Sequence, residues 1–402
     1  MAGPSIRYYN FYLELSKQHE VRILLSELNG FTEKLPCELL TRKSLNYQLQ
    51  WCDIVITQGL TLFYYPKLKK VNKILVIDLY DPFILENLEI RPNNFLGSSL
   101  YNVDLRILKE QIMQGDYFIC SNERQMDFWV GILAISGAVD VENYAQRKRI
   151  ADTIGLVPFG IPNENPEATT PHILRENTPG FHNDDFIVIW SGGTWGWLDL
   201  DTVIDAFALL KEANPRVKLY IMGGQQNDKL KEKCEKKGVL NKNVFLGNWV
   251  PYNERQNYLL DSDIGLVTHF DSLETRYSHR TRVLDYIWCE LPVVSTKGDY
   301  LTDELIVNMK CGVSIEYTNS DQLAAVILKL ANDDATISKF SSNMASIKND
   351  LRWQVVMKDL MEYCSSPYKV KKHKENFLLR TCDTVIYKAK KTIYHLKNKI
   401  KR

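Results

Sequence analysis

A charged loop between two apolar runs carries the residues best suited to chemistry. The run Ile264–Val267 predicts a buried parallel strand, and the apolar run 291–295 predicts the next one. A helix is expected to open near Ser278, and a helix N-terminus favours anions. Because loops at the carboxyl ends of parallel strands face the ligand crevice, this loop predicts a site for an anionic, hydroxyl-rich ligand. Its charged residues are Asp271, Glu274, Arg276, Arg280 and Arg282. The alternative is a solvated charged loop.

A glycine-rich loop supplies a second candidate contact for an anion. It follows a predicted strand at 186–190 and precedes a predicted helix at 201–211, a context in which backbone amides approach a diphosphate. The loop contains no basic residue, whereas Arg280 and Arg282 of the charged loop are of the type that binds phosphate through two parallel hydrogen bonds. The alternative for Arg282 is an ion pair on a helix surface. The small residues of the loop are Gly192, Gly193 and Thr194.

Two carboxylates and a histidine lie near other predicted strand ends. Asp78 ends the predicted strand 73–77, and Asp81 follows three residues later. A carboxylate in this place can bind or deprotonate an acceptor hydroxyl, whereas an Asp-Pro turn with Asp81 as a helix cap is the structural alternative. We favour a functional role for Asp78 and a cap for Asp81, which stays a candidate for the cleft. His269 follows the strand Ile264–Val267 and either lines the same cleft or is structural.

The segment 280–294 resembles the donor-binding segment of retaining family-4 glycosyltransferases with the GT-B fold. The likeness rests on Arg-Thr-Arg-Val-Leu-Asp-Tyr-Ile-Trp at 280–288 and Glu-Leu-Pro-Val-Val at 290–294, a pattern similar to one bacterial branch. The resemblance implies an α/β fold of two facing doubly wound Rossmann-like domains. It also implies a nucleotide-diphosphate sugar bound by the C-terminal domain, an acceptor bound by the N-terminal domain, retention of configuration, and no metal ion or cofactor.

The resemblance assigns roles to two acidic residues. The family places two acids eight residues apart, one on the donor sugar and one on the ribose. Asp285 occupies the second position, and Tyr277 stands eight residues before it. Glu274 is the nearest acid to that first position, so we assign it to the sugar as a catalytic candidate together with Asp78.

Other family positions hold different residues in this chain. The Arg and Lys of the family's glycine-rich loop correspond here to Gly193 and Leu198, and Asp78 stands where many relatives have a histidine. The charge expected on the diphosphate then comes from Arg280, Arg282 or Arg7.

The N-terminal residues Ala2-Gly3-Pro4-Ser5-Ile6-Arg7 resemble a segment that follows the first strand in the same family. The resemblance therefore implies that Gly3 and Arg7 lie at the cleft. It also predicts a gap in the sheet beside a strand at 20–25, because the first strand has no counterpart. We expect Met1 to be an internal methionine of a longer reading frame or the start of a shortened gene; a divergent sheet is the alternative.

Composition and charge limit the class of protein. A chain of 402 residues with 45% hydrophobic and 25% charged residues suits two globular domains. No apolar run approaches the ~20 residues that span a bilayer, and no signal-peptide core is present. The eight cysteines are scattered without a CxxC pair, which favours a reducing cytoplasm and gives no metal-ligand spacing.

The domain boundaries follow the alternation of strands and helices. We predict an acceptor-side Rossmann-like domain at 1–165, a donor-binding Rossmann-like domain at 184–350, a helix at 351–366 and a basic tail at 367–402. The linker between the domains is rich in Pro, Asn, Glu and Thr.

The tail differs in charge from the rest of the chain. Residues 367–402 hold twelve Lys or Arg and two acids, so the tail carries +10 of a total charge of +1, and the remainder carries −9. Apolar residues recur at helical spacing from Leu378 to Ile400, which predicts a basic amphipathic helix on an anionic membrane surface. The alternatives are packing on the acidic body or disorder. The acidic body and the lack of a nucleic-acid motif argue against nucleic acid as a partner.

These observations predict a glycosyltransferase that moves a sugar from a nucleotide-diphosphate sugar to a glycan or lipid-linked glycan acceptor, in bacterial surface polysaccharide synthesis. The expected location is the cytoplasm, at the inner face of the membrane. A nucleotide-sugar epimerase with the same fold and a catalytically idle partner subunit are the alternatives.

Overall fold

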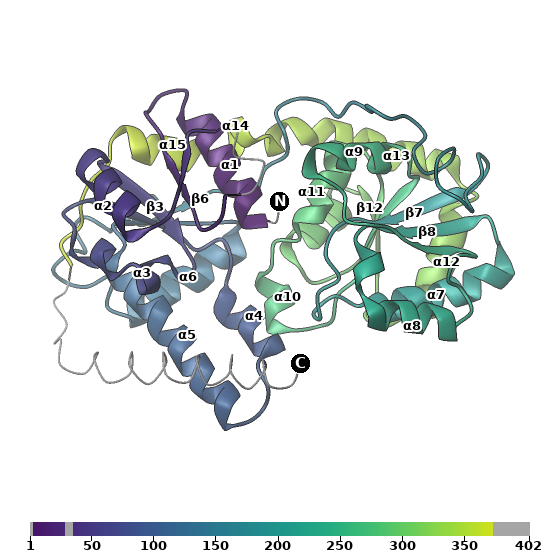
Figure 1. Ribbon diagram of the computed structural model, residues 1–402, viewed down its shortest axis with the longest axis horizontal. Helices are drawn as coiled ribbons and strands as arrows, with labels where there is room; N and C mark the ends of the chain where they lie inside the picture. The colour runs from purple at the N-terminus through teal and green to yellow at the C-terminus, as the bar shows by residue number, and fades with distance from the viewer. Residues whose placement is uncertain (1–2, 29–34, 373–402) are drawn as a thin grey trace. The chain divides into compact units, whose positions relative to one another are not determined.

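The computed structural model describes residues 3–28 and 35–372, which divide into two compact units (Figure 1). Unit 1 comprises the described residues of Met1–Ile23 and Leu156–Met361. Unit 2 comprises the described residues of Leu24–Gly155 and Glu362–Arg402. The division falls inside three elements: β1 (Ile23–Leu25), β6 (Ile154–Leu156) and α15 (Lys358–Ser365).

Unit 1 consists of an N-terminal helix, separated in sequence from the rest of the unit, and a series of alternating strands and helices. Its strands are β7 (Phe186–Trp190), β8 (Val217–Ile221), β9 (Val244–Leu246), β10 (Ile264–Val267), β11 (Val293–Thr296) and β12 (Gly312–Ile315). Its helices are α1 (Gly3–Leu15), α7 (Leu200–Ala213), α8 (Asp228–Lys236), α9 (Arg255–Leu260), α10 (Leu273–Tyr277), α11 (Thr281–Trp288), α12 (Ser320–Leu330), α13 (Asp334–Ile347) and α14 (Trp353–Val356). A π-helical segment spans Thr302–Asn308.

The sheet of unit 1 is parallel and has the order β12-β11-β10-β7-β8-β9. This is the order of a doubly wound Rossmann sheet, in which the chain starts at the centre and winds outward in both directions. The central strands β7 and β10 are almost entirely buried apolar runs, as expected of a sheet covered on both faces.

Helices cover both faces of this sheet (Figure 1). On one face, α7 and α12 pack together and place Phe207 and Ile327 in a core with Val188 of β7. The polar residues Asp199 and Asn319 accept hydrogen bonds from backbone N–H groups in the first turns of α7 and α12. Such caps satisfy backbone donors that the start of a helix leaves unpaired. Asp and Asn are among the residue types that favour this position, so they account for where these two helices begin.

The N-terminal helix α1 belongs to unit 1, although the sequence placed residues 1–165 in one N-terminal domain. The ring of Phe11 meets the edge of Trp353 on α14, with the centroids 6.3 Å apart. Both side chains are buried, and their apolar contact holds the helix against the end of the C-terminal domain. The predicted single helix at 351–366 is in fact the two helices α14 and α15.

Unit 2 contains a four-stranded sheet of order β3-β4-β5-β6. Its strands from β3 to β5 pair in parallel and are β3 (Ile54–Gln58), β4 (Ile74–Asp78) and β5 (Tyr117–Cys120). Its helices are α2 (Arg42–Trp51), α3 (Thr61–Tyr64), α4 (Phe83–Ile90), α5 (Phe95–Gln114) and α6 (Glu123–Ile135). Within the described residues, β1 pairs only with β2 (Cys37–Leu39) in a separate two-stranded sheet, so this strand is not part of the β3-β4-β5-β6 sheet.

The predicted amphipathic helix between Leu378 and Ile400 lies outside the described residues. Within the described ranges 3–28 and 35–372, no helix is long and apolar enough to cross a membrane.

Candidate functional site

The strand order of unit 1 reverses between β7 and β10, and the loops that follow these two strands meet at their carboxyl ends. In a doubly wound sheet, this reversal opens the crevice where ligands bind. Two contacts tie the loops together: Ser191 donates its backbone N–H to the Tyr286 hydroxyl at 3.0 Å, and the Thr268 hydroxyl donates to the Asp199 carbonyl at 2.6 Å. The glycine-rich loop and the charged loop therefore form one site.

The glycine-rich loop presents backbone without large side chains at the carboxyl end of β7. Gly192 has φ +93°, a conformation that residues with a side chain rarely adopt. A Cβ atom on Gly193 would lie 2.4 Å from Nε1 of the exposed Trp195 side chain, so a larger residue here would displace this ring. Thr194 accepts a hydrogen bond from Asn227 Nδ2 at 3.0 Å, which fixes the outer part of the loop.

Arg282 joins the two loops through its guanidinium. Its Nη2 donates to the Gly193 carbonyl at 2.9 Å, and the guanidinium carbon lies 4.3 Å from the centre of the Trp190 ring. Its Nη1 is buried without a hydrogen-bond partner, although the residue as a whole is partly exposed. Burial lowers the Arg282 pKa to about 10, so the side chain is still charged at neutral pH. A charged, unpaired donor beside the glycine-rich loop fits an anionic ligand.

Arg280 is held by Glu274 in a buried ion pair. The Arg280 Nη1 and Nη2 atoms donate to the two Glu274 carboxylate oxygens at 2.9 and 2.5 Å. Ser272 caps the short helix α10 and turns Glu274 inward, where it is 2% exposed. Arg280 Nε is left buried and without a partner. Glu274, which the sequence assigned to the sugar, has both carboxylate oxygens engaged with Arg280.

Two histidines with buried ring nitrogens lie beside the arginines. Burial lowers the pKa of His279 to about 3, with a smaller contribution from Arg7, and neither ring nitrogen has a hydrogen-bond partner. Its ring stacks near that of Tyr300. Burial, aided by Arg280, also lowers the pKa of His269 to about 3. The Nε2 atom of His269 lies 3.1 Å from the Lys297 carbonyl, and its Nδ1 has no partner. Both rings are therefore neutral at pH 7.

Asp299 completes this cluster at the end of β11. Its carboxylate accepts hydrogen bonds from the backbone N–H of Leu301 at 3.0 Å and of Thr302 at 3.2 Å. Its Oδ2 lies 3.8 Å from His269 Nε2. Burial raises the Asp299 pKa to about 6, although Arg280 opposes the rise.

Asp285, the expected ribose ligand, lies on α11 one turn after Arg282. Its Oδ1 accepts a hydrogen bond from Arg255 Nε at 2.9 Å, and 29% of its side chain is exposed. The Arg255 guanidinium also lies over the rings of Tyr252 and Trp288, at 3.7 and 4.6 Å from their centroids. These contacts hold the Asp285 carboxylate in place while part of its surface stays accessible.

The two N-terminal candidates lie on α1, within unit 1. Gly3 is the first residue of the helix. Arg7 is fully buried, and its Nη1 donates to the carbonyls of Val157 at 2.9 Å and Pro158 at 3.3 Å. Arg7 therefore fixes the backbone at Val157 and Pro158, where the chain enters unit 1. Its positive charge also lowers the pKa of His279.

The remaining candidates, Asp78 and Asp81, belong to unit 2. Asp78 ends β4, is 4% exposed, and accepts a hydrogen bond from the Tyr80 N–H at 3.2 Å. The predicted cap role of Asp81 is wrong, because the N-cap of α4 is Pro82 and makes no side-chain cap bond. The Asp-Pro turn places the helix start one residue later than the pattern suggests.

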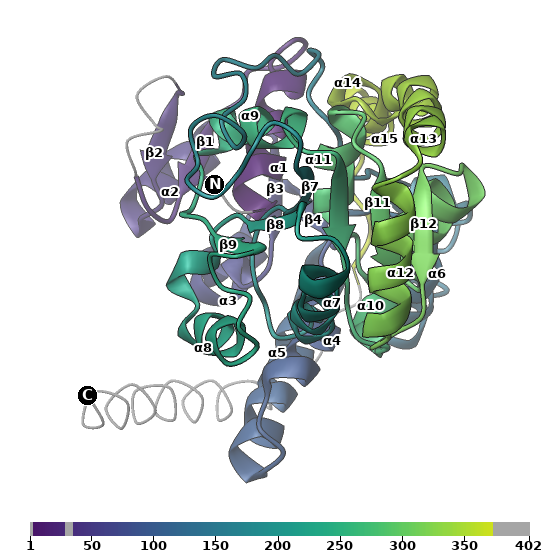
Figure 2. The ribbon, with the colours of Figure 1, turned by 90° about the vertical axis from the view of Figure 1, so that its right-hand side faces the viewer.

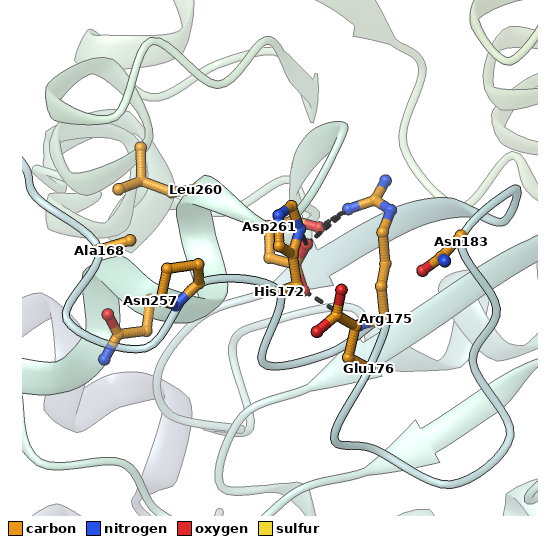
Figure 3. Close-up of a pocket in the computed structure, with 9 residues that line it drawn as sticks. Ala168, His172, Arg175, Glu176, Asn183, Asn257, Leu260 and Asp261 are labelled. Atoms are coloured by element: carbon orange, nitrogen blue, oxygen red, sulfur yellow. Dashed lines mark hydrogen bonds and ion pairs between the residues drawn. The ribbon is translucent and has the colours of Figure 1, made fainter.

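Two open hollows lie elsewhere. The larger, of about 500 Å³, is lined by residues that precede β7 and β10, at the opposite edge of the sheet from the crevice. Figure 3 shows the Arg175 guanidinium directed at Asp261 in this hollow, where its Nη1 lies 2.9 Å from Oδ1. The other, of about 430 Å³, lies in unit 2 beside Tyr64 and Tyr65. In ranges 3–28 and 35–372, no group of three metal-ligating side chains is found.

The sequence did not single out three residues of the cluster. His279 and Asp299 lie in or near the charged loop, but the burial of their side chains results from packing that residue spacing does not show. Arg255 gave no signal, because its partner Asp285 lies thirty residues away. Asp299 closely follows the predicted strand 291–295, and this position would have identified it as a candidate site residue.

The buried histidines predict that acid weakens the fold. Between pH 6.5 and about 3, the unfolded chain binds protons at His269 and His279 that the folded chain excludes, so the free energy of unfolding falls as the pH falls. Asp299 acts in the opposite direction between pH 3.8 and about 6, because its folded form binds the proton more tightly. The two histidines together outweigh this single carboxyl group.

Urea unfolding at a series of pH values would measure this dependence. In the native protein, the free energy of unfolding falls as the pH falls. We expect His279→Asn to reduce this slope by up to about 1.4 kcal/mol per pH unit, the contribution of one proton. If the free energy of unfolding changes with pH at the same slope in the native protein and the variant between pH 4 and 6, the assignment of a neutral, buried imidazole is contradicted.

The C-terminal part of the chain resembles a known protein family. Residues 176–346 match the model of a family described as Glycosyl transferases group 1. No curated protein sequence matches the chain.

Solved structures match over most of the chain. HepE from Anabaena in complex with UDP is 16% identical, with a TM-score of 0.67 over 91% of this chain and 96% of that chain. HepE with UDP and glucose gives a TM-score of 0.69 at 15% identity, over 91% and 96%. WaaG, a glycosyltransferase involved in lipopolysaccharide biosynthesis, is 16% identical, with a TM-score of 0.65 over 91% and 97%. This likeness confirms the predicted GT-B fold of two Rossmann-like α/β domains.

Proposed function

We propose that this chain is a glycosyltransferase that transfers a sugar from a nucleotide-diphosphate sugar to a glycan or lipid-linked glycan acceptor, with retention of configuration. The observation that carries the proposal is a group of buried nitrogen atoms without partners in the segment that follows β10: Arg280 Nε, Arg282 Nη1, His269 Nδ1 and both ring nitrogens of His279. Of these residues, Arg282 also contacts the glycine-rich loop. Buried polar atoms are normally paired, so a group of unpaired ones calls for a partner, and a bound anionic ligand would supply it.

The chemistry of these groups suits a diphosphate leaving group. Backbone N–H groups at Gly192 and Gly193 and the charge of Arg282 would stabilise the negative charge that develops when the sugar–phosphate bond breaks. Arg282 thereby supplies a positive charge that the glycine-rich loop lacks. The neutral imidazole of His279 would add a hydrogen bond without further charge. No metal ion or cofactor is part of this proposal.

Two acidic residues divide the remaining roles on the donor side. Asp285, partly exposed and held by Arg255, would bind the ribose hydroxyls. Because both Glu274 oxygens are engaged by Arg280, we propose that Glu274 positions this arginine beside the donor sugar. On unit 2, Asp78 is the candidate for the acceptor hydroxyl.

The family match and the bound ligands of the neighbours support a nucleotide donor. HepE was solved with UDP and with UDP-glucose, so uridine diphosphate is the first nucleotide to test. WaaG, by its description, supports a role in surface polysaccharide synthesis. We propose a cytoplasmic location at the inner membrane face, with the basic tail 367–402 as the contact.

Thermal unfolding of the full chain with nucleotides tests donor binding. We expect UDP to raise the Tm and to stabilise the fold by about 2.7 kcal/mol at a hundredfold excess over Kd, since it binds only the folded state. Mixing with UDP-sugars should then release UDP, and faster in the presence of a glycan acceptor.

The outcomes of this test separate the alternatives. Binding without any release of UDP would identify an idle partner subunit, and conversion of the nucleotide sugar itself would identify an epimerase. No stabilisation by any nucleoside diphosphate would contradict a nucleotide donor.

A further inference from the structure

An exposed apolar surface lies on unit 2, in the segment 135–150 that follows helix α6. Ile135 is 87% exposed and Val141 is 99% exposed, and Tyr144 and Ile150 are each more than half exposed. Single apolar residues on a surface are ordinary, but four within sixteen residues are a local concentration. We call this segment the 135–150 patch.

The chain leaves the described structure beside this patch. The Gln146 side chain donates to the Lys369 carbonyl at 3.1 Å and accepts from the Lys371 N–H at 3.2 Å. Asn143 Nδ2 donates to the Lys371 carbonyl at 3.2 Å, and Val370 is buried between these contacts. Residues 369–371, near the end of the described range, are therefore held against the 135–150 patch.

The charge around the patch is mainly positive. The segments 135–150 and 367–372 hold two acids, Asp140 and Glu142, and six basic residues. Arg147 is buried, and the five basic residues that reach the surface are Lys148, Arg149, Lys369, Lys371 and Lys372. Two of the exposed basic residues form surface ion pairs, Lys371 with Glu142 and Arg149 with Asp152, and such pairs are weak. Residues 373–402 add nine Lys or Arg and two acids. Apolar side chains beside excess basic charge match the interface of an anionic membrane.

We infer that the 135–150 patch is a second membrane contact, in which Ile135 and Val141 enter the headgroup region of an anionic bilayer while residues 373–402 attach to the same bilayer. Stable attachment needs two signals, because one weak contact alone is readily reversible. The first residues of the basic tail, 369 and 371, contact the patch, so a bilayer bound at the patch would lie beside the start of the tail. This inference is independent of the proposed sugar transfer, since the contact needs neither donor nor acceptor.

Sedimentation with vesicles tests the inference on the full chain. Vesicles of phosphatidylglycerol and phosphatidylcholine provide the anionic surface, and phosphatidylcholine alone provides the neutral one. We expect the double variant Ile135→Ser with Val141→Ser to bind anionic vesicles about tenfold more weakly, because two apolar side chains no longer leave water. Both residues are exposed, so the fold should be unaffected.

A matched control replaces two exposed apolar residues of unit 1, Leu209→Ser with Val355→Ser, and should bind as the native chain does. The inference fails if the patch variant binds as tightly as the native chain, because the tail then acts alone. It also fails if the control loses as much binding. A variant that changes only self-association on size-exclusion chromatography would identify the patch as a contact between two copies instead.

Discussion

Glu274→Gln is expected to destabilise the protein by about 3 kcal/mol. The substitution keeps the shape of the side chain but removes the charge that balances Arg280, whose side chain is 8% exposed. Removing one partner of a buried ion pair leaves the other charge without compensation, which costs about 3–5 kcal/mol. Urea unfolding at pH 7 would give this value, and the Tm should fall accordingly.

The control for this prediction removes both charges. Glu274→Gln combined with Arg280→Gln should recover most of the lost stability, because no unpaired charge remains in the interior. The single variant Arg280→Gln leaves Glu274 buried and unpaired, and it should be destabilised to a similar extent.

Kinetics would separate positioning from direct contact with the sugar. If Glu274→Gln unfolds like the native protein but shows a much higher KM for the donor, Glu274 binds the sugar directly and the ion pair contributes little. If stability falls and the Arg280 variant loses donor affinity too, the pair acts as a unit.

The strands that position the site could be predicted because their sequences are unambiguous. Residues 186–190 and 264–267 are apolar runs bounded by turn residues, and β7 and β10 occupy these ranges. The strands β2 and β12 were missed because they are short and carry polar or glycine residues. Helix α13 was missed for a related reason: only Met344 is fully buried, so its apolar periodicity is weak.

The candidate site could be located from the sequence but its internal pairing could not. The position of a residue after a predicted strand can be read from the neighbouring sequence. This position was enough to predict that Arg280 and Arg282 belong to the site. The ion pair of Arg280 with Glu274 depends on the five-residue helix α10, which is too short to give a periodic signal. The lowered pKa of His279 owes a part, after burial, to the charge of Arg7, which lies 272 residues earlier in the chain. Such contacts follow from tertiary packing, which residue spacing does not encode.

Arg282→Ala is expected to weaken nucleoside diphosphate binding about a hundredfold, equivalent to about 2.8 kcal/mol. The guanidinium carries a buried donor without a partner and also holds the Gly193 carbonyl at 2.9 Å. Loss of a buried, charged hydrogen-bond donor to a bound anion costs about 2–5 kcal/mol. Titration calorimetry with UDP would measure the change in Kd.

Two further variants locate the cause of this loss. Arg282→Lys keeps the charge but cannot bond the loop and the ligand at the same time, so it should recover only part of the affinity. Arg276→Ala removes an exposed arginine from the same charged loop and should leave the Kd unchanged. A folded Arg282→Ala variant that binds UDP as tightly as the native protein would exclude this arginine from the diphosphate site. Equal losses in the Arg276 and Arg282 variants would show that the general positive charge of the loop, rather than a placed guanidinium, attracts the nucleotide.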